Sequence, residues 1–181
     1  QFVRDARIAQ IYEGTNGIQA MDLLGRKMGI NKGIVFFRLV EEMKSTVSIG
    51  KTFPVTEDLS KNLESAIDKL INVANSLTQS VTSGDAKAAF AHATPFLEVF
   101  GDVIIGWMLL WRASVAASKL QKITDDLEEQ LQNKIKKNKN TAFYDGQIKS
   151  AFFFIETILP TSIGKMDSIL KNCKAAVEIS E

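Results

Sequence analysis

The sequence predicts an all-α protein folded as a helical bundle. Apolar residues recur at steps of three and four along almost the whole chain, which is the period of an amphipathic helix. No window alternates apolar and polar residues with the composition of a strand, so no sheet is expected. Only 3 of the 181 residues are proline, which leaves long stretches free to be helical.

The apolar stripes follow one another in chain order. The expected helices carry them at residues 18–28, 36–47, 59–81, 97–111, 127–135, 152–159 and 163–177, after a short first helix that is already running at Phe2. Each stripe gives one face to a common core. Together they predict a bundle rather than isolated helices.

Turn and cap residues mark the breaks between these helices. Asn16, with Gln19 three residues later, resembles a capping box, and Asp85 after Ser83-Gly84 is a candidate N-cap. The clearest linker is 50–56, which contains Pro54, and a polar loop is expected at 136–140. Pro95 predicts a kink or a helix start, and Pro160 predicts a junction between two helices.

The most apolar stretch, residues 96–117, invites comparison with a membrane span. Glu98, Asp102 and Arg112 interrupt it, and the charge-free run from Val103 to Trp111 is much shorter than the roughly 20 residues that a spanning helix needs. We therefore expect a buried helix and no membrane span.

Composition excludes several classes of function. Hydrophobic residues make up 45% and charged residues 24%, and the net charge is +1, so nothing favours a disordered chain or a nucleic-acid partner. The single cysteine, Cys173, excludes an intramolecular disulfide, and its place on the last stripe predicts a small buried side chain. The single histidine, His92, has no ligand-type neighbours at metal-binding spacing, so no metal site is expected. The chain begins Gln-Phe-Val-Arg without an initiating methionine, which suggests a piece of a larger protein.

Glu13 lies between the first two expected helices, beside Gly14. On the residues alone, it is a carboxylate in a solvated loop. Its neighbours add more, in the runs RDARI (4–8), IYEGTNGIQ (11–19) and DLLGRK (22–27). These runs resemble the C-terminal signature of the acyl-CoA dehydrogenase family, almost without a break over residues 3–28.

A looser resemblance continues from Lys51. It rests on ATPFL (93–97), GWM (106–108), FYDG (143–146) and Leu159-Pro160. These runs are similar to the extra C-terminal helical domain of the longer, methylmercaptopropionyl-CoA dehydrogenase-like members. The resemblance therefore implies two parts: residues 1–50 end the dehydrogenase helical domain and carry the loop with the base, and residues 51–181 form an appended helical domain.

The resemblance implies specific chemistry. Family members oxidise the Cα–Cβ bond of an acyl-CoA thioester to a trans-2-enoyl-CoA, with FAD accepting the hydride and a glutamate removing the α-proton. Glu13 matches that base, and Gly14 leaves room for the substrate beside it. Thr15, Asn16 and Gly17 match positions that contact FAD at a helix N-terminus, where free N–H groups favour cofactor oxygens. Gly17 stands where the family more often has glutamine or an acid, which puts a side-chain contact from there in doubt.

The resemblance also implies the wider setting. It points to an acyl-CoA substrate, electron-transferring flavoprotein as electron acceptor, a homo-oligomer, and no activity from residues 1–181 alone. The compartment implied is the cytoplasm of a bacterium, or the mitochondrial matrix if the source is eukaryotic. Two alternatives remain open at this point: a non-catalytic helical interaction or oligomerisation module, and an acyl-CoA oxidase.

Overall fold

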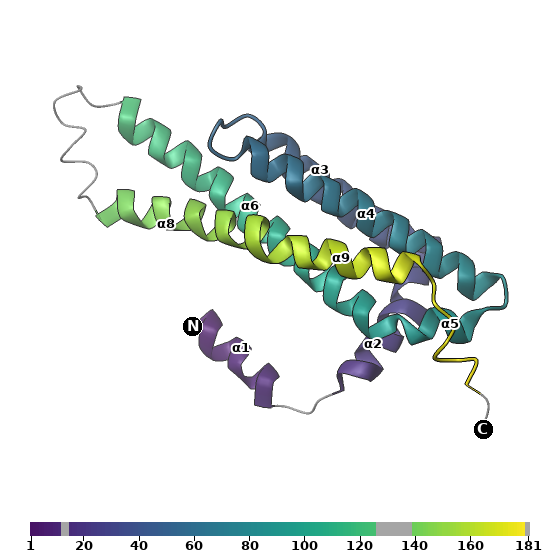
Figure 1. Cartoon of the computed structure of the whole chain (residues 1–181). Helices are drawn as coiled ribbons and strands as arrows, with labels where there is room; N and C mark the ends of the chain where they lie inside the picture. Colours follow the sequence, from purple (N-terminus) through teal and green to yellow (C-terminus); the bar gives the residue numbers. More distant parts are fainter. Residues whose placement is uncertain (12–14, 126–138, 180–181) are drawn as a thin grey trace.

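The structure is a computed structural model that describes residues 1–11, 15–125 and 139–179 (Figure 1). The described residues are helical, with no strand, which confirms the all-α prediction. The helices are α1 (Phe2–Ile11), α2 (Asn16–Gly25), α3 (Ile34–Gly50), α4 (Glu57–Thr82), α5 (Ala86–Ala91), α6 (Ala93–Asp125), α8 (Lys139–Phe153) and α9 (Leu159–Leu170). A 3-10 segment, η1 (Lys27–Gly33), joins α2 to α3, and a π-helical turn, η3 (Phe154–Ile158), joins α8 to α9. The stripe expected at 127–135 lies outside the described residues.

Helix α6 is the axis of the bundle. It packs against α2, α3, α4, α8 and α9, while α3 and α4 also pair with each other (Figure 1). The predicted stripes supply the core, because residues three and four apart on each helix lie on its inward face. Fully or almost fully buried members of these stripes include Val40, Met43, Val47, Leu59, Leu63, Ile67, Leu70, Phe96, Val103, Leu110, Ile155 and Leu159.

The prediction that α6 is buried is wrong for one of its faces. Val99, Val103 and Leu110 are completely buried, but Trp111 and Val115 are each 50% exposed. The segment Ala93–Ile123 is long and apolar enough to cross a membrane by length and composition alone, and about a third of its most apolar window is buried in the bundle. The difference arises because α6 is apolar around most of its circumference, so burial of one face leaves apolar side chains on another.

A buried hydrogen-bond cluster closes the connection between α3 and α4, the predicted linker at 50–56. Thr56 Oγ1 donates to the carbonyl oxygen of Gly50 at 2.7 Å, and Ser60 Oγ donates to the carbonyl oxygen of Thr56 at 2.7 Å. Both side chains are completely buried. A Cβ on Gly50 would lie 2.3 Å from Ser60 Oγ, so only glycine fits at this close approach. The two helices therefore meet through polar groups that satisfy one another.

Replacing Thr56 by valine is expected to lower the free energy of unfolding by about 0.5–1.5 kcal/mol, because the buried carbonyl of Gly50 loses the shorter of its two hydrogen bonds and keeps only the one from the N–H of Phe53 at 3.3 Å, while the side-chain shape is kept. Urea unfolding of the purified chain measures the change. Thr52→Val is the matched control: Thr52 Oγ1 donates to the carbonyl oxygen of Ile49 at 2.7 Å, but on an exposed turn where water replaces the donor. Equal losses in the two variants would contradict the buried-carbonyl explanation.

The breaks mostly lie where the sequence places them. Pro95 lies in the first turn of α6, and Pro160 lies in the first turn of α9 after the π turn. Asp85 is the N-cap residue of α5, although its side chain makes no capping hydrogen bond and is instead ion-paired with Lys174. Of the polar loop expected at 136–140, residues 136–138 lie outside the described residues. Lys139 and Asn140 already belong to α8, so the loop prediction is wrong for these two residues.

The last helix is shorter than its stripe. It ends at Leu170, and Asn172 has a left-handed φ of 46° and donates its N–H to the carbonyl oxygen of Ile169. An asparagine in this conformation is a common helix stop. Cys173 therefore lies beyond the helix and is exposed, so the prediction that it is buried is wrong.

Candidate functional site

The predicted site lies at the connection between α1 and α2. Glu13 and Gly14, the predicted base and its substrate-side neighbour, lie outside the described residues, so their roles stay predictions. Thr15, Asn16 and Gly17 are described and form the start of α2. The three residues predicted to contact FAD are therefore together at one helix N-terminus, directly after the predicted base.

The N-terminus of α2 is not capped in the way the sequence suggested. The N-cap residue is Thr15, not Asn16, and its side chain makes no capping hydrogen bond. The carbonyl oxygen of Thr15 accepts the N–H of Gln19 at 2.9 Å, which places Gln19 one turn into the helix. The capping-box prediction is wrong because the helix begins one residue earlier than a cap at Asn16 requires. The first-turn N–H groups, which no helix can satisfy internally, remain available to an acceptor.

Space is open around the same helix end. Asn16 and Gly17 are exposed, and a Cβ built on Gly17 would meet no atom within 4 Å among the described residues. The N-terminal end of a helix carries a partial positive charge. The arrangement therefore suits an oxygen-rich or phosphate-bearing group.

The other end of α2 holds the helix on the bundle. Ala20 and Leu24 are buried in the core, and a Cβ on Gly25 would lie only 3.0 Å from the ring of Phe90. A larger residue at Gly25 would have to displace the Phe90 ring or α2 itself. The apolar contacts of one face thus fix the position from which the first turn projects.

An ion pair follows at the end of α2. Arg26 Nε and Nη2 donate to the two carboxylate oxygens of Asp22 at 2.6 and 2.9 Å, and Lys27 Nζ lies 3.3 Å from the same carboxylate. The hydrogen bond from Arg26, with the added charge of Lys27, lowers the pKa of Asp22. The group is exposed, so we expect this pair to orient the chain rather than to stabilise it appreciably. Any stabilisation is present at neutral pH and is lost as the pH falls through the lowered pKa.

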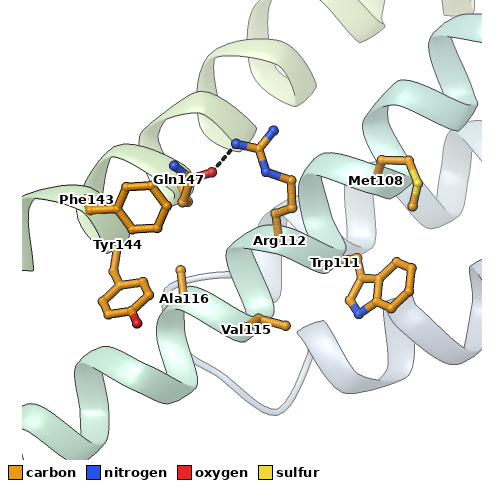
Figure 2. A pocket seen from close by; sticks show the side chains of 8 residues that line it. All are labelled: Met108, Trp111, Arg112, Val115, Ala116, Phe143, Tyr144 and Gln147. Carbon is orange, nitrogen blue, oxygen red and sulfur yellow. Dashed lines mark hydrogen bonds between the residues drawn. The ribbon is translucent and has the colours of Figure 1, made fainter. Parts of the chain in front are cut away.

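A second candidate surface, not predicted from the sequence, is an apolar groove between α6 and α8 (Figure 2). Its volume is about 510 Å³. Helix α6 contributes five side chains and α8 three; the lining residues are Met108, Trp111, Arg112, Val115, Ala116, Phe143, Tyr144 and Gln147. The guanidinium of Arg112 donates a hydrogen bond to the side-chain oxygen of Gln147, which bridges the two helices at the groove. The groove is apolar apart from this bridge.

A second groove lies on the other side of the same α6 side chains. It runs between α3 and α6, has a volume of about 310 Å³, and shares Trp111 and Val115 with the first. Ile49 and Phe53 line its α3 side, and Lys119 and Lys122 line its end. We call the surface formed by the two grooves and the shared Trp111 and Val115 the open face of α6.

The sequence did contain a signal for the open face. Met108, Trp111, Val115 and Ser118 continue the helical stripe of Leu97, Phe100 and Ile104, while a separate face of α6 carries the buried Val103 and Leu110. Two apolar faces on one long helix imply two packing partners. Which face the bundle itself covers depends on where α3 and α8 lie, and this follows only from the structure.

Among the residues that the structure describes, no group of three or more His, Cys, Asp or Glu side chains is placed to hold a metal ion. His92 is partly buried, and its Nε2 has no hydrogen-bond partner in the structure. It lies in the short turn between α5 and α6, far in sequence from the signature segment.

Comparison with known proteins identifies the family. Residues 39–180 match a family profile described as "Acetyl-CoA dehydrogenase C-terminal like". The chain is 36% identical over 143 residues to the 3-methylmercaptopropionyl-CoA dehydrogenase of Ruegeria pomeroyi, an alignment covering 75% of this chain and 23% of that protein. It is 28% identical over 165 residues to the broad-specificity linear acyl-CoA dehydrogenase FadE5 of Mycobacterium tuberculosis, covering 88% and 25%.

A butyryl-CoA dehydrogenase of Syntrophomonas wolfei is 26% identical over 180 residues, covering 98% of this chain and 27% of that protein. The chain thus spans about a quarter of the length of each of these relatives. The profile covers most of the chain, and it begins inside α3, after the signature segment. The chain therefore belongs to the acyl-CoA dehydrogenase family and is a C-terminal part of such a protein.

Proposed function

We propose that this chain is the C-terminal portion of an FAD-dependent acyl-CoA dehydrogenase that converts acyl-CoA thioesters to trans-2-enoyl-CoA products. In this proposal Glu13 is the base that takes the α-proton, and Gly14 leaves space for the acyl thioester. Thr15, Asn16 and Gly17 bind the cofactor. The observation that carries the proposal is the nearly unbroken signature around Glu13, in a chain whose remainder matches the family.

The start of α2 supports the cofactor part of the proposal. Its first-turn N–H groups point out of a helix end with no side-chain cap and with open space at Gly17, which fits the oxygens of FAD. Bound FAD supplies the hydride acceptor for the Cβ–H bond. The residues of this chain present the Glu13 carboxylate to the α-proton and hold the N-terminal end of α2 against the cofactor.

An α-proton of a thioester is too weakly acidic for a free carboxylate, so the developing negative charge on the thioester oxygen needs hydrogen-bond donors. The backbone N–H of Glu13 is the donor that this chain contributes in our proposal. Rigid attachment of α2 to the bundle through Ala20 and Leu24 keeps this segment in place. The carboxylate that takes the proton and the N–H that stabilises the negative charge then belong to the same residue. Their positions relative to the substrate are therefore fixed together.

The wider setting is part of the same proposal. The chain covers about a quarter of its relatives' length, so we propose that the rest of the flavin site and acyl pocket lie outside residues 1–181, and that the isolated chain has no turnover. Electron-transferring flavoprotein is the proposed acceptor, and the enzyme is proposed to be a homo-oligomer without a membrane span. We place it in the cytoplasm of a bacterium, or in the mitochondrial matrix if the source is eukaryotic.

Anaerobic absorbance spectroscopy of the full-length protein tests the function directly. Saturated acyl-CoAs of increasing chain length are added in turn, and bleaching of the oxidised flavin band is expected with at least one of them. Bleaching reports α,β-dehydrogenation because the two electrons leave the substrate for the flavin. The acyl-CoA that bleaches at the lowest concentration identifies the preferred chain length.

The same protein separates the alternatives. A flavin-containing protein that no acyl-CoA bleaches would contradict the proposed reaction, and a protein that binds no flavin would leave only a helical interaction module. Peroxide formation at the rate of substrate oxidation in air would identify an acyl-CoA oxidase. Reduction of electron-transferring flavoprotein with little peroxide is the result we expect.

A further inference from the structure

We propose that the open face of α6 is the docking surface for an acid-flanked amphipathic helix from the part of the same polypeptide that precedes this chain. The inference rests on the proposed function, in which this chain is the C-terminal portion of a longer dehydrogenase. It assigns to the helical bundle of this chain a specific surface by which it is held on the rest of the enzyme.

The open face continues an apolar stripe of α6. Along α6, one stripe runs through Leu97, Phe100, Ile104, Met108, Trp111 and Val115 at steps of three and four. The first three of these side chains are partly buried against the core of the bundle. Trp111 and Val115 are half exposed at the centre of two adjoining grooves. The described part of this chain thus covers the first half of the stripe more than the second.

The second half of this stripe lies on an apolar, concave surface. Phe143 is 60% exposed and lines the α8-side groove with Trp111 and Val115 (Figure 2). Ile49 is 53% exposed and lines the α3-side groove with the same two residues. Four large apolar side chains on one concave surface are unusual for a face that stays in water. A groove between helices accepts a further helix, whose side chains at i, i+3, i+4 and i+7 fill it.

Charge indicates what kind of helix fits. The two grooves are lined by Arg112, Lys119 and Lys122, and by no carboxylate among the residues described. The hydrogen-bond partner of Arg112, Gln147, is a neutral amide. A second copy of the chain docked on this face through a two-fold axis would bring the three cations of one copy towards those of the other. The two sets of positive charges would then repel each other. A helix with acidic residues beside its apolar face complements them.

The length of the relatives indicates where that helix comes from. About three quarters of each relative lies outside the region that this chain matches. Helix α1, through which that polypeptide would enter, forms no extensive packing with the bundle in the part of the chain that the structure describes (Figure 1). Val3 and Ile8 on α1, and Ile18 and Met21 on α2, are also exposed by more than half. The N-terminal side of the chain therefore lacks apolar partners that the preceding polypeptide would supply.

Cysteine labelling of the full-length protein tests the docking. Val115→Cys places a thiol at the centre of the open face, and Ser65→Cys places one at an exposed position of α4, outside both grooves of the open face. Maleimide modification is followed peptide by peptide with mass spectrometry, so other cysteines do not interfere. We expect the thiol at position 115 to react at least about tenfold more slowly than the thiol at position 65, since docking leaves only local opening as a route to the reagent.

Similar rates at the two positions would overturn the proposal. Protection at position 115 that disappears on dilution to the monomer would also overturn it, because the cover is then a second copy. So would protection that requires added phosphatidylglycerol vesicles, because the cover is then an anionic lipid surface. If Val115→Cys does not fold, Ser118→Cys in the α3-side groove is the replacement, since it exchanges one small side chain for another.

Flavin content and bleaching by acyl-CoA are measured on the same preparations. Protection of position 115 from maleimide without bleaching of the flavin by any acyl-CoA would contradict the proposed reaction but would still support the docking surface. Bleaching with an unprotected position 115 would do the reverse. The two proposals therefore fail independently.

Discussion

Replacing Glu13 by glutamine in the full-length protein is expected to lower the turnover of acyl-CoA by about 10²–10⁴-fold, the usual contribution of a positioned general base. Glutamine keeps the size and most of the hydrogen-bonding capacity of the side chain but cannot accept a proton. The flavin content is expected to stay unchanged, because the proposed FAD contacts come from residues 15–17. Steady-state turnover with an artificial electron acceptor and the rate of flavin bleaching in a single anaerobic turnover measure the effect.

Glu41→Gln is the matched control, since Glu41 is an exposed carboxylate on α3 that has no part in the proposed site. It is expected to leave turnover unchanged. A Glu13→Gln protein that binds flavin and turns over at the normal rate would remove the base assignment, and the signature loop would then be an architectural turn. Loss of flavin together with activity would instead show that the substitution disturbs the cofactor site.

Most of the fold follows from the spacing of apolar residues. The stripes of α3 and α4 are buried where their period predicts, at positions such as Met43, Val47, Leu63 and Leu70, because a bundle helix has one inward face. The end of the last helix did not follow from the pattern. Cys173 continues the helical spacing, but the left-handed conformation of Asn172 ends the helix first. Local backbone geometry decided this boundary, and the apolar pattern contains no information about it.

The sequence predicted some features of the candidate site, and others followed only from the structure. Glu13 and Gly14 were found through a resemblance to a family, because a carboxylate beside a glycine has no distinctive chemistry of its own. The position of Thr15 as N-cap and the open space at Gly17 required the structure. The open face of α6 required it too: the sequence shows that Trp111 and Val115 are apolar, and only the positions of α3 and α8 show that no described helix covers them.

Replacing Phe96 by alanine is expected to have the largest effect on stability, a loss of about 3–5 kcal/mol in the free energy of unfolding. Phe96 is completely buried near the start of α6. Its ring lies 5.9 Å from that of Phe100 in an edge-on arrangement, and Phe100 lies 6.0 Å from Phe36 of α3. Truncation would remove a large apolar side chain and leave a cavity in the core beside Phe100, which the surrounding helices cannot fill without moving.

A domain of this size typically unfolds with a total free energy of about 5–15 kcal/mol, so the loss is a large fraction of the whole. Each kcal/mol shifts the midpoint of thermal unfolding by about 2–4 °C at this chain length, and we expect a shift of about 10 °C, measured by circular dichroism. Phe153→Ala is the control, because Phe153 is 62% exposed on α8, and its cost should stay below about 1 kcal/mol. Equal costs for the two phenylalanines would mean that the packing around Phe96 is not part of the stable core.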